Sequence, residues 1–263
     1  MPSKRIGLAL SGGAALGAAH IGVLEVLEAH GIRPDCVAGT SAGSVVGALV
    51  CAGMPLQRIH ELALALQWKQ LGRVVRPRFG FFDGSRMEEN LIELIGDLDF
   101  ERLEIPLAVA AADIQSEELV ILREGRLAPA IRASCALPGV FTPVEHDGRL
   151  LVDGGLINNL PVSAVREMGS EYVIAVDLSA PLVGIRKRPR SVIDMWLLTL
   201  ATVLRSVHRE ASLADVVIEP QVGEFNPADI SKASLIIERG REAAEAALPR
   251  ILSDLGMEDD LAG

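Results

Sequence analysis

The stretch from Gly39 to Gly43 limits the possible folds of this chain more than any other. It reads Gly-Thr-Ser-Ala-Gly, with a short apolar run before it and a helical apolar pattern after it. A serine between two glycines at the junction of a strand and a helix is typical of a nucleophile elbow, in which a sharp turn holds the hydroxyl out of the fold. The pattern predicts that Ser41 is a nucleophile. The alternative is a tight turn in which Ser41 only caps the helix.

A second glycine turn, Ser11–Gly17, follows the apolar run Ile6–Leu10 and opens another helical pattern. Backbone N–H groups at such a junction can converge on an anion. The glycine spacing does not fit a dinucleotide fingerprint, and Ala18 and Ala19 stand where a P-loop has Lys and Ser or Thr. We therefore expect an oxyanion hole, the alternative being a plain strand-to-helix turn. The candidate residues are Gly12, Gly13, Ala14 and Gly17.

A base for the nucleophile is the next requirement. Of the five histidines only His20, just after the glycine turn, is expected near the site, and none lies in the late loop that a Ser–His–Asp triad of the α/β-hydrolase order requires. Asp153 fits better, because it ends the apolar run Leu150–Val152 and precedes Gly154 and Gly155, which let the chain turn beside it. A carboxylate there can hydrogen-bond the serine hydroxyl directly. Its alternative role is an Asx-type turn or a helix cap.

Apolar runs and helical patterns alternate along the chain, which predicts an α/β fold with a mostly parallel sheet and helices on its faces. The 263 residues suit a single domain, 1–263, in which residues 191–252 complete the fold. The capping-box pattern of Ser85 and Glu88 begins one helix, and Pro249 is expected to bend or end the last. The expected strands are Ile6–Leu10, Cys36–Ala38, Leu107–Ala112, Leu119–Leu122, Leu150–Val152, Tyr172–Asp177 and Asp215–Glu219. The expected helices are Ile21–Gly31, Val45–Ala52, Leu56–Leu66, Ser85–Ile95, Ala128–Ser134, one from about Pro161, Ser191–Glu210 and Ser231–Ile251.

Composition excludes several classes of protein. A net charge of −10 argues against nucleic-acid binding. No apolar run approaches the roughly 18 residues of a membrane span, and the N-terminus leads into a strand rather than a signal peptide, so we expect a cytoplasmic protein. Three cysteines, Cys36, Cys51 and Cys135, with no Cys-x-x-Cys spacing, predict reduced thiols and no zinc site. No metal or cofactor is expected.

Two segments have open interpretations. Arg73–Phe82 combines arginines with half of the six phenylalanines. It fits a lid, a contact with an anionic lipid surface in which Phe inserts, or an ordinary loop whose phenylalanines enter the core. The helix expected at Ser191–Glu210, with Trp196, fits an acyl channel, a dimer face or core packing.

The ordered set of glycine turn, elbow and Asp153-Gly154-Gly155 resembles the patatin-like phospholipase family. Arg132–Pro138 and Asn158–Val162 are similar to its bacterial, cytoplasmic members, and the likeness covers about residues 6–180. The resemblance implies a three-layer α/β/α fold with a mostly parallel central sheet. It also implies a Ser–Asp dyad, with Ser41 as nucleophile and Asp153 as base, and a glycine-loop oxyanion hole. One departure is Leu16, where family members often carry Lys or Arg.

The same resemblance implies hydrolysis of the fatty-acyl esters of phospholipids or lysophospholipids through an acyl-enzyme. Alternatives are an acyltransferase or thioesterase with the same nucleophile, and a lipid-binding regulatory module with little turnover. The expected partners are the lipid substrate and, through Arg73–Phe82, the inner surface of a membrane. No oligomeric state follows from the sequence.

Overall fold

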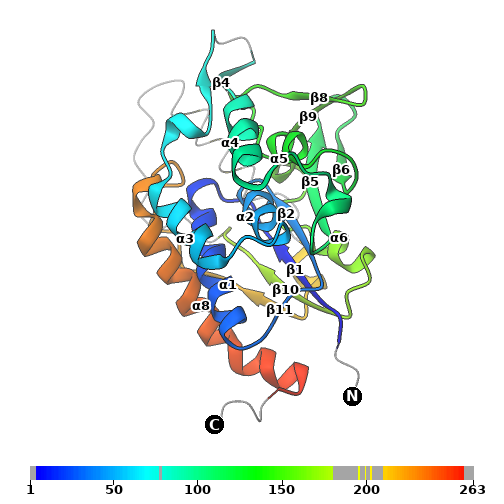
Figure 1. Ribbon diagram of the computed structural model, residues 1–263, viewed down its shortest axis with the longest axis vertical. Helices are drawn as coiled ribbons and strands as arrows, with labels where there is room; N and C mark the ends of the chain where they lie inside the picture. The colour runs from blue at the N-terminus through cyan, green and yellow to red at the C-terminus, as the bar shows by residue number, and fades with distance from the viewer. Residues whose placement is uncertain are drawn as a thin grey trace.

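The central sheet is built around β1 (Ile6–Leu10), which pairs in parallel with β2 (Cys36–Thr40) and β10 (Tyr172–Val176) (Figure 1). On the outer sides, β5 (Leu107–Asp113) continues the parallel sheet beyond β2, and β11 (Val216–Ile218) continues it beyond β10. The computed structural model describes residues 4–76, 79–179 and 210–257, with the single positions 195, 199 and 202. Most of the helix expected at 191–210, including Trp196, lies outside them.

Three further strands make the far end of the sheet antiparallel. β6 (Glu118–Leu122) and β9 (Arg149–Asp153) both pair antiparallel with β5, and β8 (Val144–His146) pairs antiparallel with β9. Each residue of β5 that pairs with β6 also pairs with either β2 or β9. β6 therefore lies along one edge of β5, and β2 and β9 both lie along the opposite edge. Two strands that run in opposite directions therefore meet end to end along a single edge of β5.

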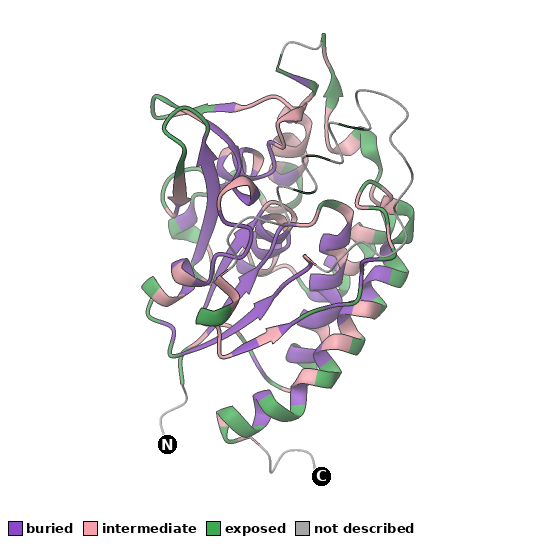
Figure 2. Cartoon of the chain, turned by 180° about the vertical axis from the view of Figure 1, so that it is seen from behind, coloured by how far each residue is buried: buried purple, intermediate pink, exposed green. Residues whose placement is uncertain are grey.

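Side chains alternate between the two faces of the sheet, as the period of a strand requires. One face presents large aliphatic residues such as Leu8 and Ile174 to helices, and the other presents small residues such as Ala9 and Ala108. The first face is covered by α1 (Ala19–Ala29), α2 (Ala42–Cys51), α5 (Leu127–Ser134) and α8 (Ala233–Leu255), and the second by α6 (Val162–Glu167). Figure 2 shows the strands between these layers as the buried centre. The predicted three-layer α/β/α fold with a mostly parallel sheet is confirmed.

A small second sheet lies outside the three layers. β4 (Gly80–Asp83) pairs antiparallel with β3 (Arg73–Val74) and in parallel with β7 (Gly139–Phe141). The ring of Phe82 packs against that of Phe141 at 6.0 Å, but the side chains of Phe79 and Phe81 are 61% and 43% exposed. The interpretation of this segment as a loop whose phenylalanines all enter the core is therefore wrong.

Two helix ends differ from the predictions. In α4 (Ser85–Ile95) the N-cap is Gly84 and no side chain caps the helix, so the capping box is wrong. Ser85 is already helical, and its hydroxyl donates to the Asp83 carboxylate at 2.8 Å. The last helix, α8, does not end at Pro249 but continues to Leu255, because apolar side chains on both sides of the proline are buried; the bend expected at Pro249 stays a prediction.

The remaining described helix is α3 (Leu56–Ala65), which packs against α1 and α2. No helix within the described ranges is both long enough and apolar enough to span a membrane. The three cysteines are buried and form no disulfide.

Candidate functional site

The register of the sheet brings Ser41 and Asp153 together. β2 ends at Thr40, which lies opposite Ala110 of β5, and β9 arrives from the opposite direction and ends at Asp153, opposite Ala111. Because β2 and β9 occupy the same edge of β5, the residue after Thr40 meets Asp153 head-on. Two residues 112 positions apart in the sequence are thus brought next to each other by strand pairing alone, without a long loop that carries one of them to the other.

The backbone of Ser41 is held in a strained conformation. Its φ of 50° and ψ of −122° are unusual for a residue with a side chain, and such strain is typical of functional sites. The Ser41 N–H donates to the Ser134 hydroxyl at 2.8 Å, and that hydroxyl donates to the Ala110 carbonyl at 2.6 Å. The Ser44 hydroxyl donates to the Ser41 carbonyl at 2.6 Å. Two serine hydroxyls therefore fix the elbow from both sides.

The carboxyl group of Asp153 is buried beside this elbow. It accepts a hydrogen bond from the Gly155 N–H at 2.8 Å, and the Ser41 hydroxyl lies close enough to stabilise its charged form. Burial raises the pKa of Asp153 from 3.8 to about 6, against the smaller lowering effect of these two groups. Gly154 passes the carbonyl oxygen of Ala110 so closely that a Cβ there would overlap it. Of the two glycines after Asp153, Gly154 thus allows a close approach to β5, and Gly155 donates a hydrogen bond to the carboxylate.

The glycine loop lies against the other side of Ser41. A Cβ on Gly12 would lie 3.1 Å from the Ser41 Cβ and 2.6 Å from Oδ1 of Asn159. The Gly12 N–H is already used, since it donates to the Asn159 carbonyl at 3.2 Å. Within the described residues the N–H groups of Gly13 and Ala14 have no hydrogen-bond acceptor. Ala14 also has a strained φ of 50°. Of the four loop residues singled out in the sequence, these two have N–H groups available to a ligand.

The fourth loop residue has a packing role. Gly17 lies in a short 3-10 helix, Ala14–Ala18, where a Cβ would lie 2.5 Å from that of Ala42 at the start of α2. Leu16 of the same turn is 4% exposed and belongs to the hydrophobic core. The side chain that departs from the family pattern is therefore directed into the core.

The elbow glycines have the close contacts that the sequence pattern predicted. A Cβ on Gly39 would lie 2.6 Å from the carbonyl oxygen of Gly43, and one on Gly43 would lie 2.6 Å from that of Ser11. The elbow is thus packed against the glycine loop, backbone to backbone.

Behind the loop, two buried side chains hold its backbone. His20 is fully buried, and its Nε2–H donates to the Ser11 carbonyl at 2.8 Å. Burial lowers the pKa of His20 to about 4, so the imidazole is neutral. The Asn159 amide donates to the Gly12 carbonyl at 3.4 Å and to the Ser179 hydroxyl at 3.2 Å. His20 supports the loop and does not contact Ser41.

The remaining histidines of the described ranges are engaged elsewhere. His30 bonds to the Val26 carbonyl, His60 to Glu25, and His146 pairs with Asp147, while His208 falls outside those ranges. Among the acidic and histidine side chains of the described ranges, Asp153 is therefore the candidate base that lies beside Ser41. The predicted role of Asp153 as a partner of the serine thus has a geometric basis.

One further side chain lies near both residues. The Cys135 thiol interacts with the side chains of Ser41 and Ser44, and the charge of Asp153 acts on it. Burial, and then the charge of Asp153, raise the pKa of this thiol far above its usual range, so it remains protonated. Sequence reasoning assigned no role to Ser134, Cys135 or Asn159. They lie in the two stretches similar to bacterial family members, and that was the one signal available.

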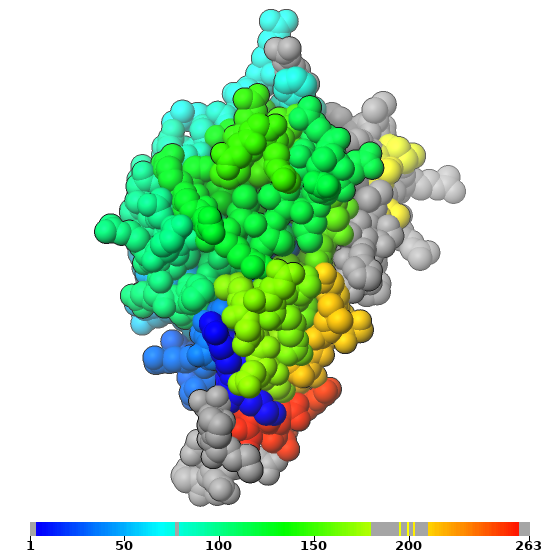
Figure 3. Space-filling view, turned by 90° about the vertical axis from the view of Figure 1, so that its right-hand side faces the viewer, coloured from blue at the N-terminus to red at the C-terminus, as the bar shows by residue number. Residues whose placement is uncertain are grey.

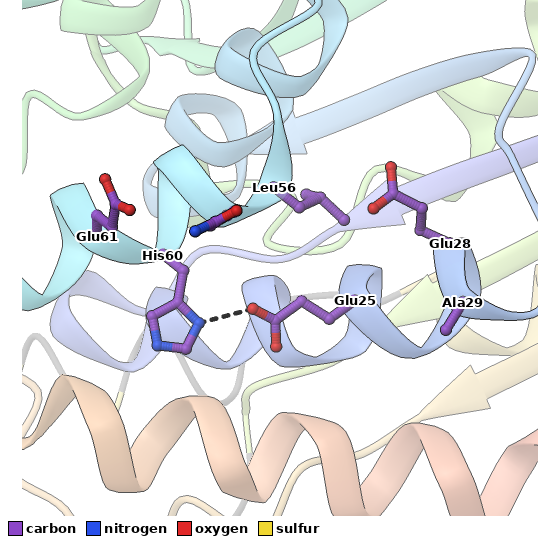
Figure 4. Close-up of a pocket in the computed structure, with 7 residues that line it drawn as sticks. Glu25, Glu28, Ala29, Leu56, His60 and Glu61 are labelled. Carbon is purple, nitrogen blue, oxygen red and sulfur yellow. Dashed lines mark hydrogen bonds and ion pairs between the residues drawn. The ribbon is translucent and has the colours of Figure 1, made fainter.

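A separate hollow of about 480 Å³ opens between α1 and α3 (Figure 4). In its lining, His60 Nδ1 and the Glu25 carboxylate are hydrogen-bonded at 2.6 Å. Glu28 and Glu61 make the rim of the hollow acidic. None of its lining residues belongs to the Ser41–Asp153 site. Nowhere in the described ranges do three or more His, Cys, Asp or Glu side chains lie close enough together to hold a metal ion.

Comparison with known sequences gives several relatives. The chain is 35% identical over 199 residues to an uncharacterized NTE family protein of Mycobacterium tuberculosis, which covers 74% of this chain and 55% of that protein. It is 36% identical over 190 residues to Patatin-like phospholipase domain-containing protein 6 of Homo sapiens, and 31% identical over 186 residues to Lysophospholipase NTE1 of Scheffersomyces stipitis. Each of these covers 68% of this chain, but only 14% and 12% of the relative. The chain thus spans about half the length of the mycobacterial relative and much less of the other two.

The fold is similar to that of VipD from Legionella pneumophila, with a TM-score of 0.57 at 13% identity, over 95% of this chain and 67% of that one. Residues 8–166 match the family model described as patatin-like phospholipase. That match covers more than half of the chain and includes the glycine loop, the elbow and Asp153. The resemblance seen in the sequence is confirmed, and this chain belongs to the patatin-like phospholipase family.

Proposed function

We propose that this chain is a serine acyl hydrolase that cleaves fatty-acyl esters of phospholipids or lysophospholipids through a Ser–Asp dyad. The observation that carries the proposal is the position of Ser41 beside the buried Asp153 carboxylate, where β2 and β9 meet, next to the available N–H groups of Gly13 and Ala14. Membership of the patatin-like phospholipase family supports the reaction class. The printed name of one relative, a lysophospholipase, supports the substrate class.

In the first half of the reaction Ser41 becomes acylated. Asp153 accepts the hydroxyl proton while Oγ forms a bond to the ester carbonyl carbon, and the N–H groups of Gly13 and Ala14 hold the oxygen on which negative charge develops. The bond to the glycerol oxygen then breaks, and that oxygen takes the proton from Asp153. The fatty acid remains bound to Ser41 as an ester.

In the second half water completes the hydrolysis. Asp153 accepts a proton from water while the water oxygen attacks the acyl carbon, and the bond to Ser41 Oγ breaks as Oγ regains the proton. A pKa of about 6 makes Asp153 a stronger base than a free carboxylate and still leaves it ionised at neutral pH. Substrates of this class are held in membranes or micelles, so the proposal includes contact with a lipid surface.

The test is a panel of phospholipids and lysophospholipids assayed with wild type, Ser41→Ala and Asp153→Asn. Ser41→Ala is expected to abolish both fatty-acid release and labelling by a fluorophosphonate, and Asp153→Asn to lower both rates by about a thousandfold or more. Full labelling of Ser41→Ala would contradict the assignment of the nucleophile.

Two further measurements separate the alternatives. Product analysis with a competing alcohol or thiol distinguishes hydrolysis from acyl transfer, since water is then only one of two acceptors. Turnover of a short-chain p-nitrophenyl ester distinguishes an enzyme from a lipid-binding module. No turnover of any ester by wild type would contradict the proposed function.

A further inference from the structure

Exposed apolar side chains are concentrated in one stretch of the chain, part of which projects from the molecule. Of the ten exposed large hydrophobic residues in the described ranges, five fall between positions 64 and 81. They are Leu64, Trp68, Val74, Phe79 and Phe81. Most belong to residues 68–76 and 79–83, here named the aromatic hairpin, which contain β3 and β4. Figure 1 and Figure 3 show the cyan part with β4 standing out from the rest of the molecule.

The charge of this segment is opposite to that of the whole chain. Between Glu61 and Asp83 the sequence has four cationic residues and no acidic one, although the chain carries a net charge of −10. Arg73 is paired with Glu89 at 2.8 Å. Lys69 and Arg76 are exposed, and no ion pair within the described residues neutralises them. The aromatic hairpin therefore combines apolar side chains and cations on a strongly acidic protein.

The base of the hairpin is attached firmly to the site. β4 pairs with β7, and Arg132 of α5 forms ion pairs with Asp83 at 3.2 Å and Glu88 at 3.3 Å. α5 and β7 flank the stretch 135–138, in which the Ala136 carbonyl accepts the N–H of Asp153 at 3.1 Å. The base of the hairpin is thus connected through α5 and β7 to the residues around Asp153.

We propose that the aromatic hairpin is a docking surface for an anionic lipid membrane. Its exposed aromatic and aliphatic side chains enter the boundary between headgroups and acyl chains, while Lys69 and Arg76 contact lipid phosphates. Aromatic side chains and Arg or Lys are the residue types that favour this boundary. The choice of a lipid partner rests on the proposed function, whereas the charge and exposure of the hairpin do not.

The experiment is vesicle flotation with the full chain carrying Ser41→Ala, so that no lipid is consumed. Vesicles of phosphatidylcholine alone are compared with vesicles that also contain phosphatidylglycerol. The triple variant Val74→Ser, Phe79→Ser, Phe81→Ser and the double variant Lys69→Gln, Arg76→Gln are each expected to lower partitioning to the anionic vesicles by about tenfold or more. The matched control replaces exposed apolar residues elsewhere, Leu94, Ile114 and Leu235, by Ser and is expected to bind as before.

Wild-type binding gives a readout that needs no variant. Partitioning should be stronger on anionic than on neutral vesicles and should weaken as salt is added, because the cations act through screened charge. Binding that ignores both lipid charge and salt, or equal loss in the control variant, would overturn the proposal. So would gel filtration in which the hairpin substitutions dissociate a dimer, because the hairpin would then pack against a second copy.

Failure of the docking proposal is distinguishable from failure of the proposed function. Turnover of a soluble p-nitrophenyl ester by the chain with intact Ser41 is measured alongside. Ester turnover without flotation overturns docking and leaves the hydrolase. Flotation without turnover of soluble or lipid esters leaves docking and contradicts the hydrolase.

Discussion

At the scale of single residues, strain is concentrated at the candidate site. Four non-glycine residues of the described ranges have a positive φ, and two of them are Ser41 and Ala14. The other two, Glu117 and Asp147, lie in turns between antiparallel strands. Strain of this kind persists only where surrounding bonds impose it. The Ser134 hydroxyl, between the Ser41 N–H and the Ala110 carbonyl, is one of those bonds.

We expect Ser134→Ala to lower kcat by roughly tenfold to a hundredfold with little change in KM, because the nucleophile loses a positioning bond while lipid contacts remain. The Ser41 N–H and the buried Ala110 carbonyl also lose this hydrogen-bond partner, which should lower the free energy of unfolding by about 1–3 kcal/mol. Steady-state kinetics and urea denaturation measure the two effects. Ser163→Ala, which removes a hydroxyl bonded to Glu210 away from the site, is the control and should affect stability alone. An unchanged kcat in Ser134→Ala would leave Ser134 a purely structural residue.

The raised pKa of Asp153 predicts two pH effects. If ionised Asp153 is the base, kcat/KM should fall on the acid side with an apparent pKa of about 6. The folded-state pKa lies above the unfolded value of 3.8, so the folded chain binds this proton more tightly, and the resulting stability is lost as pH rises through about 6.

Asp153→Asn removes this ionisation and should therefore be more stable than wild type at neutral pH. The gain is about 3 kcal/mol, because the folded and unfolded pKa values of Asp153 differ by about two and a tenfold change in proton affinity corresponds to roughly 1.36 kcal/mol. It should vanish below about pH 3, under both pKa values, where the folded and the unfolded states of wild type are both protonated. Urea denaturation of both proteins across this pH range measures it. A stability difference that does not vary with pH would show that Asp153 titrates normally.

The sequence identified Ser41, Asp153 and the glycine loop because each follows an apolar run and is flanked by glycines. It did not identify Ser134 or Asn159 as supports of the site. A hydroxyl or amide side chain has no fixed hydrogen-bond partner. The partner of each of these two side chains lies in a strand or loop far away in the chain, so the local sequence does not reveal it. Nor did it show that Gly12 lacks a free N–H, since its acceptor is the Asn159 carbonyl.

At the scale of elements, α1 and α8 cross at two glycines. A Cβ on Gly22 would overlap the Ile237 carbonyl, and one on Gly240 would overlap the Ala19 carbonyl. The helices thus approach backbone to backbone, and Ala19 is the first residue after the 3-10 turn of the glycine loop. α8 therefore supports the loop from behind.

We expect Gly240→Ala to destabilise the fold by about 1–3 kcal/mol, because the added methyl must separate two tightly packed helices. Ester turnover should fall as well, since the separation begins at the end of the glycine loop. Thermal unfolding and p-nitrophenyl ester assays measure the two effects. Ser253→Ala, exposed on the same helix, serves as the control. A Gly240→Ala protein with an unchanged melting temperature would contradict this close packing.

Helices and buried strands were predicted well because the spacing of apolar residues along the chain directly reflects which side chains are buried. The sheet β3–β4–β7 was missed, since β3 has two residues and β7 three, and each is a strand only through its partner. The predicted capping box is absent for a related reason. The Ser85 hydroxyl, which the pattern assigned to the helix N-terminus, donates its hydrogen bond to the Asp83 side chain instead.

At the scale of the whole molecule, stability is distributed unevenly. Every residue of β2 and β10 is buried, whereas both residues of β3 are exposed. We expect amide hydrogens of β2 and β10 to exchange only through global unfolding, and those of the aromatic hairpin to exchange much faster through local opening. Hydrogen exchange followed by mass spectrometry measures this difference. Equal protection of the hairpin and the central strands would contradict it.

The order of the strands was beyond sequence reasoning altogether. Alternation of strands and helices predicts a parallel sheet, but not that β1 lies between β2 and β10, nor that β9 arrives antiparallel to meet β2. The β1–β10 pairing joins residues more than a hundred positions apart, such as Ile6 and Tyr172, and no local pattern records it.

This order has a consequence for synthesis of the chain on the ribosome. The glycine loop is made first, yet its supports come last: Val176 accepts the Ser11 N–H, Pro227 accepts the Ala15 N–H, and Gly240 packs on Ala19. A nascent chain already contains both Ser41 and Asp153 when these supports are still unmade. Its oxyanion donors therefore stay unplaced until α8 has emerged, so that an incomplete chain carries the dyad without the means to use it.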